Sequence, residues 1–507
     1  MKQLKISVQI VDGPFHPVLA RFPVLLALFL GIFGTYLSLS LTSMSSKYTI
    51  IVCIGLIGLA ALVYFHRYLT QLSLFAFVIA TGIGAQYRFL TQNDQFYEGF
   101  NHHGGALPEP VLGLVDIPIL CIIGIALFRF IILRMPLPKW TGLDTCIVLF
   151  LAACGISFFY APDLPLAFYE LLRYGKFTLL YVALRILFEK QRYGKLLFIA
   201  WIFALAFEGI IAFAQYFFDF HAPFYINGGV VGVNQETTSG GFDFARVTGM
   251  IGGCNSFASW LLFPLCIMIT GLFITIKKQY KKAILSLFVL GLIALILTFS
   301  RAGWISIFVC CTAFLSVVVL RGKLKPLHIK AILFFVAISI IAAQVSGIAP
   351  YIVARVTTDD SGAMGIRPEL NKIVLRMLND VPFTGLGLNN FQKVVHPYDP
   401  EQLTLFFDSV PHNIYMLFAS ETGIFGMLFL ISIGVYLFSR SISILKKPRD
   451  EYSFFIATAS VAYLLGIMVN DLADNTLRNE LVMSQCTLMA GLIMSVKPIM
   501  PHPEKTM

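Results

Sequence analysis

Long apolar segments recur along the whole chain of 507 residues. A helix needs about 20 mostly apolar residues to cross the roughly 30 Å of hydrocarbon in a bilayer. Fourteen segments approach this length and composition: 22–41, 48–65, 70–90, 112–133, 142–160, 170–187, 195–217, 254–276, 283–299, 302–320, 330–348, 413–438, 453–470 and 480–496. Because only 13% of the residues are charged, against about 25% in soluble proteins, a water-soluble fold is excluded. The sequence therefore predicts an all-α polytopic membrane protein with about 14 (12–14) transmembrane helices.

The distribution of basic residues predicts the orientation of these helices. With both termini in the cytoplasm, about two thirds of the 37 lysine and arginine residues fall in cytoplasmic segments, as the positive-inside rule expects. The net charge of +10 then sets orientation and attracts anionic headgroups. Since no basic stripe alternates with stacking aromatics, we expect no nucleic acid as a partner. The nine cysteines form no CxxC pair and are expected to be packing residues.

The same topology divides the chain into alternating membrane and outer segments. Residues 1–217 hold the first seven predicted spans, and 218–253 form an outer loop. Residues 254–348 hold spans eight to eleven, 349–412 form a large outer loop, and 413–507 hold the last three spans and a cytoplasmic tail. A loop of about 60 residues is far longer than an ordinary connection, so we expect a partly helical outer subdomain.

One amphipathic helix is predicted within the large outer loop. Pro368 suits the first turn of a helix, and apolar residues follow at helical spacing at Leu370, Val374 and Met377. Pro382 and the glycines after it end the pattern. The simplest interpretation is a short helix lying on the outer membrane surface.

Four arginines on the predicted outer side stand out, since a charge within a span costs about 2.5–3.5 kcal/mol on insertion scales. They are Arg173, Arg246, Arg301 and Arg367. Each one alone could extend to lipid headgroups or pair with a carboxylate. Converging from separate elements, however, their planar guanidinium groups would suit a diphosphate, which they can bind bidentately. The cluster therefore suggests a lipid-linked anion as substrate.

His412 begins the twelfth predicted span at the membrane interface. A histidine there can accept a proton from a hydroxyl group, although hydrogen bonding at the helix start is the simpler alternative. Glu421 is a further ionisable group that could orient an arginine or the histidine, and Gly423 and Gly426 are expected to permit close helix packing. No metal-ligand spacing, phosphate loop or nucleophile elbow is present, so we expect no metal, cofactor or ATP use.

Two short motifs precede predicted spans. Arg246 and Gly249 form an Arg-x-x-Gly stretch, followed by Asn255 at the start of the next span. Thr298 to Gly303 form a Thr-x-Ser-Arg element followed by two small residues.

A third motif runs from Arg367 to a His-Asn-x₉-Gly-x-x-Gly pattern formed by His412, Asn413, Gly423 and Gly426. In their order, spacing and predicted side, the three motifs resemble those of the O-antigen ligase and polymerase superfamily of bacterial inner-membrane glycosyltransferases. The resemblance covers residues 246–438, which is less than half of the chain.

This resemblance implies a donor glycan on undecaprenyl diphosphate at the outer face of the bacterial cytoplasmic membrane. The acceptor would be a sugar hydroxyl on lipid A-core or on another lipid-linked repeat unit, among membrane lipids and possible partners in polysaccharide export. We expect His412 to be the general base and Arg246, Arg301 and Arg367 to bind the diphosphate, with Arg173 as a weaker candidate. The supporting residues would be Asn255, Asn413, Glu421, Gly423 and Gly426.

Two alternatives remain open at this stage. A polysaccharide or lipid-linked-oligosaccharide transporter would explain many spans equally well, but it should place ionisable residues near mid-membrane and show repeat symmetry. Within the superfamily, the sequence does not distinguish a ligase from a polymerase or a protein-glycosylating relative.

Overall fold

The computed structural model describes residues 68–88, 111–189, 193–221, 224–226, 229–231, 235–239, 242–273, 278–322, 349–357, 363–406 and 410–496. The chain divides into two units, residues 1–69 and 70–507, and the fold presented below is that of the second. The predicted spans at 22–41, 48–65 and 330–348 and the tail beyond residue 496 lie outside the described residues.

Helices make up most of the described chain. A helix at Tyr68–Ala80 is followed by α3 (Asp116–Ile131), α4 (Gly142–Phe158), α5 (Leu164–Phe188), α6 (Gly194–Phe218), α7 (Cys254–Gly271), α8 (Lys278–Leu297), α9 (Arg301–Leu320), α11 (Ala349–Thr357), α12 (Ala363–Asp380), α13 (Phe391–Val394), α14 (Leu403–Phe406), α15 (Ile414–Lys446), α16 (Glu451–Asn470) and α17 (Glu480–Ser495). Short 3₁₀ helices lie at His396–Tyr398 (η2) and Thr476–Arg478 (η3).

Within the described residues, six helices are long and apolar enough to cross a membrane: α6, α7, α8, α9, α15 and α16. The other five described spans predicted from the sequence fall on the helix at Tyr68–Ala80 and on α3, α4, α5 and α17, which are shorter or more charged. The chain is thus a multi-pass membrane protein, and the figure of fourteen crossings stays a prediction.

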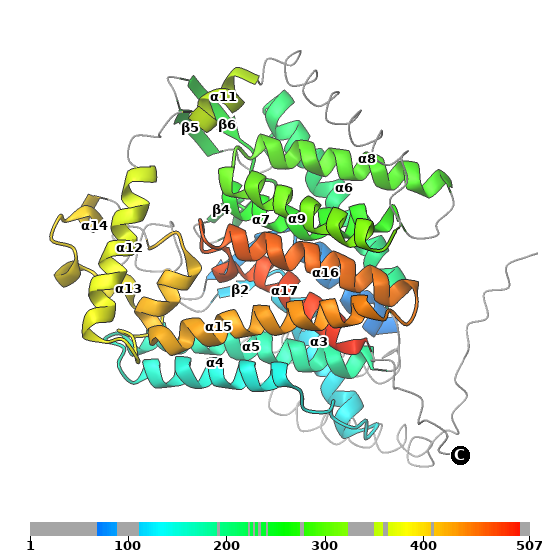
Figure 1. Cartoon of the computed structure of the whole chain (residues 1–507), viewed down its shortest axis with the longest axis horizontal. Coiled ribbons are helices and arrows are strands. Elements are labelled where there is room, and N and C mark those ends of the chain that lie inside the picture. The colour runs from blue at the N-terminus through cyan, green and yellow to red at the C-terminus, as the bar shows by residue number, and fades with distance from the viewer. Residues whose placement is uncertain are drawn as a thin grey trace, which may run out of the picture. The chain divides into compact units, whose positions relative to one another are not determined.

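The helices of the bundle pack in a connected series. In Figure 1, α15 lies beside α4 and α16, α16 lies beside α9 and α7, and α17 packs on α5. Polar caps fix where several helices start: Ser300 Oγ accepts from Gly303 N at α9, and Asn413 Oδ1 accepts from Tyr415 N at α15. These caps place Arg301 at the first residue of α9 and His412 directly before the N-cap of α15.

The all-α prediction is confirmed for most of the described chain, and three short antiparallel strand pairs accompany the helices. They pair β1 (Gln86–Arg88) with β2 (Val111–Gly113), β3 (Phe224–Ile226) with β4 (Gly229–Val231), and β5 (Gln235–Ser239) with β6 (Phe242–Arg246). Ser239 pairs with Phe242, and the two intervening residues of the sequence are both glycine, a recognised hairpin signal that the prediction passed over. Within β6, this pairing sets Arg246 opposite Gln235.

The amphipathic helix α12 does not turn its apolar face to the membrane. Leu370, Val374 and Met377 are buried in one cluster with residues of α13 and α15, including Leu417. The prediction that the apolar face of this helix lies on the membrane surface is therefore wrong, because other residues of the protein cover that face. Pro368 also lies inside α12, five residues after its start, rather than in the first turn.

Helix α15 is broken at Gly423, whose φ is 72° and ψ is 178°. The segment after Pro382 lies against this break: Ile424 N donates to Pro382 O (2.8 Å), Leu386 N to Ser420 O (2.9 Å) and Gly387 N to Glu421 O (3.1 Å). A Cβ at position 423 would lie 2.2 Å from Phe383 O, and the positive φ also favours glycine. Gly423 thus accommodates the segment after Pro382 and does not serve packing between helices.

Gly426 also differs from the expectation of close helix packing. A Cβ on Gly426 would meet Thr422 Oγ1 of its own helix at 1.9 Å. The requirement for glycine here therefore comes from the distorted turn after the break, within α15 itself.

Replacing Leu370 with Ala should lower the free energy of unfolding by about 2–5 kcal/mol, because it leaves a cavity in the cluster beneath α12. Leu375, on the same helix but 52% exposed, is the matched control, and Leu375→Ala should change stability little. Thermal unfolding in detergent measures both. Equal losses from the two variants would contradict the packing described for α12.

Candidate functional site

Three of the four arginines predicted from the sequence lie together, with a fourth that the sequence analysis did not select. Arg246 at the end of β6 donates from Nε to Thr298 O (2.8 Å), and Arg355 of α11 donates from Nε to Phe299 O (3.2 Å). Arg301, at the start of α9, donates from Nη1 to Arg355 O (3.3 Å). The turn before α9 is thus held by arginines from two other elements.

The hydrogen bonds of Arg246 and Arg367 go to neutral oxygens within the described part of the chain. Arg246 Nη2 donates to Asn255 Oδ1 (2.8 Å) at the start of α7, and Arg367 Nη1 donates to Ala473 O (3.1 Å). The predicted supporting residue Asn255 therefore contacts the arginine cluster directly. Neutral acceptors orient a guanidinium group without neutralising it, so its charge stays available to an anion.

The pKa shifts of these arginines reflect their mutual proximity. Burial, together with the charges of Arg246 and Arg301, lowers the pKa of Arg355 to about 10. Burial likewise lowers the pKa of Arg367, opposed by the carboxylate of Asp474 and reinforced by Arg301 and Arg246. Like charges held this close favour an anion between them.

His412 lies beside Asp474, in the connection between α16 and η3. The distance from His412 Nδ1 to Asp474 Oδ1 is 3.4 Å. Burial disfavours the charged form of Asp474, but the hydrogen bond and charge of His412 together with the N–H of Asn475 lower its pKa below the ordinary value. Asp474 is therefore an anion at neutral pH and can orient the imidazole ring.

Backbone hydrogen bonds hold this His–Asp pair in place. Ile414 N, two residues after His412, donates to Asp471 O (3.0 Å) and to Asp474 O (3.2 Å). Asn413 does not contact the pair through its side chain but caps α15 by accepting from Tyr415 N and Met416 N. The capping and the chain pairing together fix the start of the helix that carries the histidine.

The arginine cluster and the His–Asp pair belong to one site, because Arg367 bonds the carbonyl of Ala473, directly before Asp474, and the charge of Asp474 also acts on Arg246. Sequence reasoning missed Arg355 and Asp474. Arg355 lies in the predicted outer loop, so it is also a basic residue on the side of the membrane where the positive-inside rule expects few. Asp474 could have been found from the short polar stretch between the last two predicted spans, which also contains Asp471.

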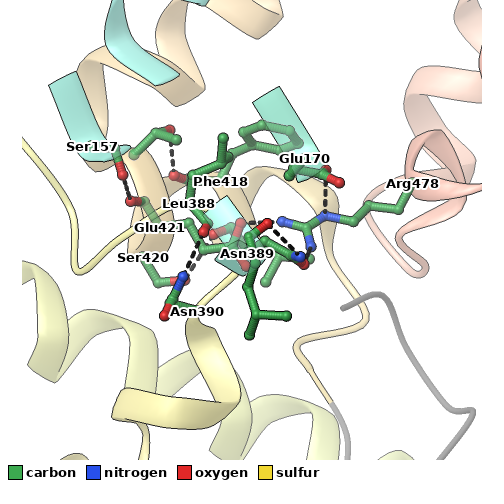
Figure 2. A network of polar contacts seen from close by, with 12 residues as sticks. Ser157, Glu170, Leu388, Asn389, Asn390, Phe418, Ser420, Glu421 and Arg478 are labelled. Carbon is green, nitrogen blue, oxygen red and sulfur yellow. Dashed lines mark hydrogen bonds and ion pairs between the residues drawn. The ribbon is translucent and has the colours of Figure 1, made fainter. Parts of the chain in front are cut away.

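Arg173 and Glu421 belong to a second, buried cluster. Figure 2 shows Arg478 of η3 reaching between Glu170 and Asn389. It forms ion pairs with Glu170 of α5 (3.7 Å) and with Glu421 of α15, and it donates to Asn389 Oδ1 (3.0 Å). Arg173 pairs with the same Glu170 and donates to Arg478 O.

Two predicted site residues, Arg173 and Glu421, belong to this second cluster and pair with charges of the protein itself. Arg173, Glu170, Glu421 and Arg478 are all nearly inaccessible, and each charge has an opposite partner. The structure does not bring Arg173 to the other three arginines, nor Glu421 to His412. We therefore interpret both as residues that join α5, α15 and η3.

Comparison with known proteins identifies a family that matches part of the chain. Residues 286–431 match the family model described as O-antigen ligase, a family of lipid-linked glycan transferases. The match includes Arg301, Arg367 and His412 and ends before Asp474. No curated protein matches the chain.

Replacing Arg173 with Met should lower the free energy of unfolding by about 3–5 kcal/mol, because it leaves two buried carboxylates, Glu170 and Glu421, with Arg478 as their shared cationic partner. Arg367→Met is the control, since Arg367 bonds a backbone carbonyl and its loss should cost about 1 kcal/mol. Thermal unfolding of both variants in nanodiscs measures the difference. Similar unfolding temperatures would mean that Arg173 does not have the structural role assigned to it.

Proposed function

We propose that this chain, whose residues 286–431 match the O-antigen ligase family model, moves a glycan from undecaprenyl diphosphate to a sugar hydroxyl at the outer face of the cytoplasmic membrane. One observation carries the proposal: arginines from β6, α9 and α11 gather around the turn before α9, and Arg367 of α12 joins them beside the His412–Asp474 pair. A cluster of cationic side chains next to a histidine is the arrangement that transfer from a diphosphate donor requires.

The arginines supply the electrostatic part of the reaction. A diphosphate leaves readily once its developing charge is neutralised, and fixed guanidinium groups neutralise it without reorganisation. We assign this role to Arg246, Arg301 and Arg367, and we add Arg355, because its pKa responds to the charges of the other three. No metal ion or nucleotide is needed in this scheme.

His412 is assigned as the general base and Asp474 as its positioning residue. With Nδ1 protonated and facing Asp474, the lone pair of Nε2 is available to the acceptor hydroxyl. The imidazole is partly accessible, with 27% of its side chain exposed, so an acceptor can reach it. Asp474 stabilises the imidazolium that forms, in the way a carboxylate supports histidine in other enzymes.

The proposed step transfers one glycosyl group with balanced charges. The acceptor oxygen attacks the anomeric carbon as its proton moves to His412, and a new C–O bond forms. The bond from the anomeric carbon to the diphosphate oxygen breaks, and its electron pair leaves with undecaprenyl diphosphate, held by the arginines. Attack in line with the leaving group inverts the anomeric configuration.

The family match favours an enzyme over the transporter alternative. We propose that the acceptor group is a sugar hydroxyl, carried either by lipid A-core or by a second lipid-linked unit. The orientation with both termini in the cytoplasm remains part of the proposal, since it places the site beside donors that have been flipped outward.

His412→Ala should abolish glycan transfer, because general-base catalysis contributes about 10²–10⁴-fold in rate. The variant is expressed in a strain lacking the protein, and gels of lipid A-core and lipid-linked glycans report the product. Loss of polymer on lipid A-core with free polymer present indicates a ligase, whereas single repeat units indicate a polymerase.

The control for this prediction is His396→Ala, which removes an exposed histidine of the same outer segment and should leave transfer intact. Membrane levels of both variants are compared by immunoblot. Product formation by His412→Ala at the wild-type level would exclude the histidine as base. Transfer by the purified protein without an energy source would separate an enzyme from a carrier.

Arg301→Ala should weaken binding of undecaprenyl diphosphate by about 10–100-fold, since a charge-assisted hydrogen bond contributes about 1.5–3 kcal/mol. Arg301→Lys should lose less, because the charge remains while the bidentate geometry is lost. Binding is measured with undecaprenyl diphosphate and protein in nanodiscs. Small and equal losses would instead favour an arginine that contacts lipid headgroups.

A further inference from the structure

The outer end of α6 holds the backbone immediately after Arg246. Three consecutive residues there, Thr248, Gly249 and Met250, are bonded through main-chain groups to two side chains of α6. On the other side, Val247 N donates to Leu297 O (3.2 Å) of α8. The chain that leaves Arg246 is therefore fixed at every residue of a short turn.

Gln215 makes three of these bonds. Its Oε1 accepts from Thr248 N (3.3 Å) and Gly249 N (3.0 Å), and its Nε2 donates to Gly249 O (3.1 Å). The side chain is fully buried. An amide that both accepts from and donates to one residue's main chain determines the orientation of that segment, which a purely apolar residue could not do.

Glu208, two helical turns earlier, makes the next bond by accepting from Met250 N (3.0 Å) at Oε2. Its other oxygen, Oε1, has no hydrogen-bond partner in the described part of the chain, and the side chain is fully buried. Burying a carboxyl group for a single backbone bond is costly. Such a residue is expected where the position of the bonded backbone matters.

The glycine of the Arg-x-x-Gly motif follows from this contact. Gly249 has φ of +56°, and a Cβ there would lie 2.2 Å from Glu208 Oε2. Only glycine lets the turn approach α6 closely enough for Met250 N to reach the carboxyl group. The motif spacing therefore links a diphosphate-binding arginine to the turn that fixes it.

We propose that Gln215, with Glu208, is a positioning residue that sets the geometry of Arg246 toward the donor diphosphate. This inference rests on the role given to Arg246 under Proposed function. Arg246 is 6% exposed and its guanidinium is directed by Thr298 O and Asn255 Oδ1, so a shift of its backbone would misalign both bonds. Misplacement of about 1 Å can cost as much as 10²-fold in an active site.

Gln215→Met tests the proposal, because it keeps the side-chain length and removes all three bonds. The dissociation constant for undecaprenyl diphosphate, measured with the full-length protein in nanodiscs, should rise on the order of tenfold. Gln215→Glu should restore most of the affinity, since a buried carboxylic acid can accept from the same N–H groups and donate to Gly249 O. Glu208→Leu provides a second measurement with the same expected direction.

Gln485→Met is the matched control. Gln485 of α17 is also fully buried, and its Nε2 donates to Trp260 O (3.1 Å), but it contacts neither Arg246 nor the turn after it. This variant also removes a buried amide but should leave the affinity for undecaprenyl diphosphate unchanged. A general loss of packing would affect both variants alike.

A double-mutant cycle separates this inference from the proposed function. Adding Gln215→Met to Arg246→Ala should weaken binding no further, because Gln215 acts through Arg246. If Arg246→Ala alone leaves the affinity unchanged, the diphosphate role of Arg246 fails. If Arg246→Ala weakens binding but Gln215→Met does not, or if the two effects add, the positioning role is overturned and the proposed function stands.

Discussion

The short connection between α16 and α17 is the constraint on which the rest of the site depends. Its backbone accepts the N–H of Ile414 and so fixes the start of α15, and its Asp474 meets His412. Further along the same connection, Arg478 enters the buried ion-pair cluster. One segment therefore joins His412 to the interior of the bundle, where charges are held by opposite partners.

The two clusters of arginines show how surroundings determine what a charge does. Arg478 is bonded to buried carboxylates, so its charge is used within the protein and stabilises helix contacts. Arg246 is oriented by a carbonyl and an amide, which leave its charge for an external anion. Burial alone does not separate the two kinds, since both are nearly inaccessible. The chemical nature of the acceptors does.

Much of the membrane architecture could be predicted, because apolar length is a local property of the sequence. The convergence of Arg246, Arg301 and Arg367 was predicted from their anomalous side of the membrane, and the structure brings them together. The partner of His412 could not be predicted, since Asp474 is 62 residues away and no periodicity links them. The position of Arg173 could not be predicted for the same reason. Glu170 lies only one helical turn away, but the hydrogen bond of Arg173 to Arg478 O of η3 depends on tertiary packing.

The break in α15 at Gly423 also bears on how sequences of this kind can diverge. The segment after Pro382 is attached to the helix through main-chain groups on both sides. Phe383 adds a stacking contact with Phe425 of the same helix, and its ring is otherwise largely exposed. Substitutions along the segment can therefore reshape the surface near the start of α15 while the anchoring survives, which offers a route for selection to change that surface without displacing His412.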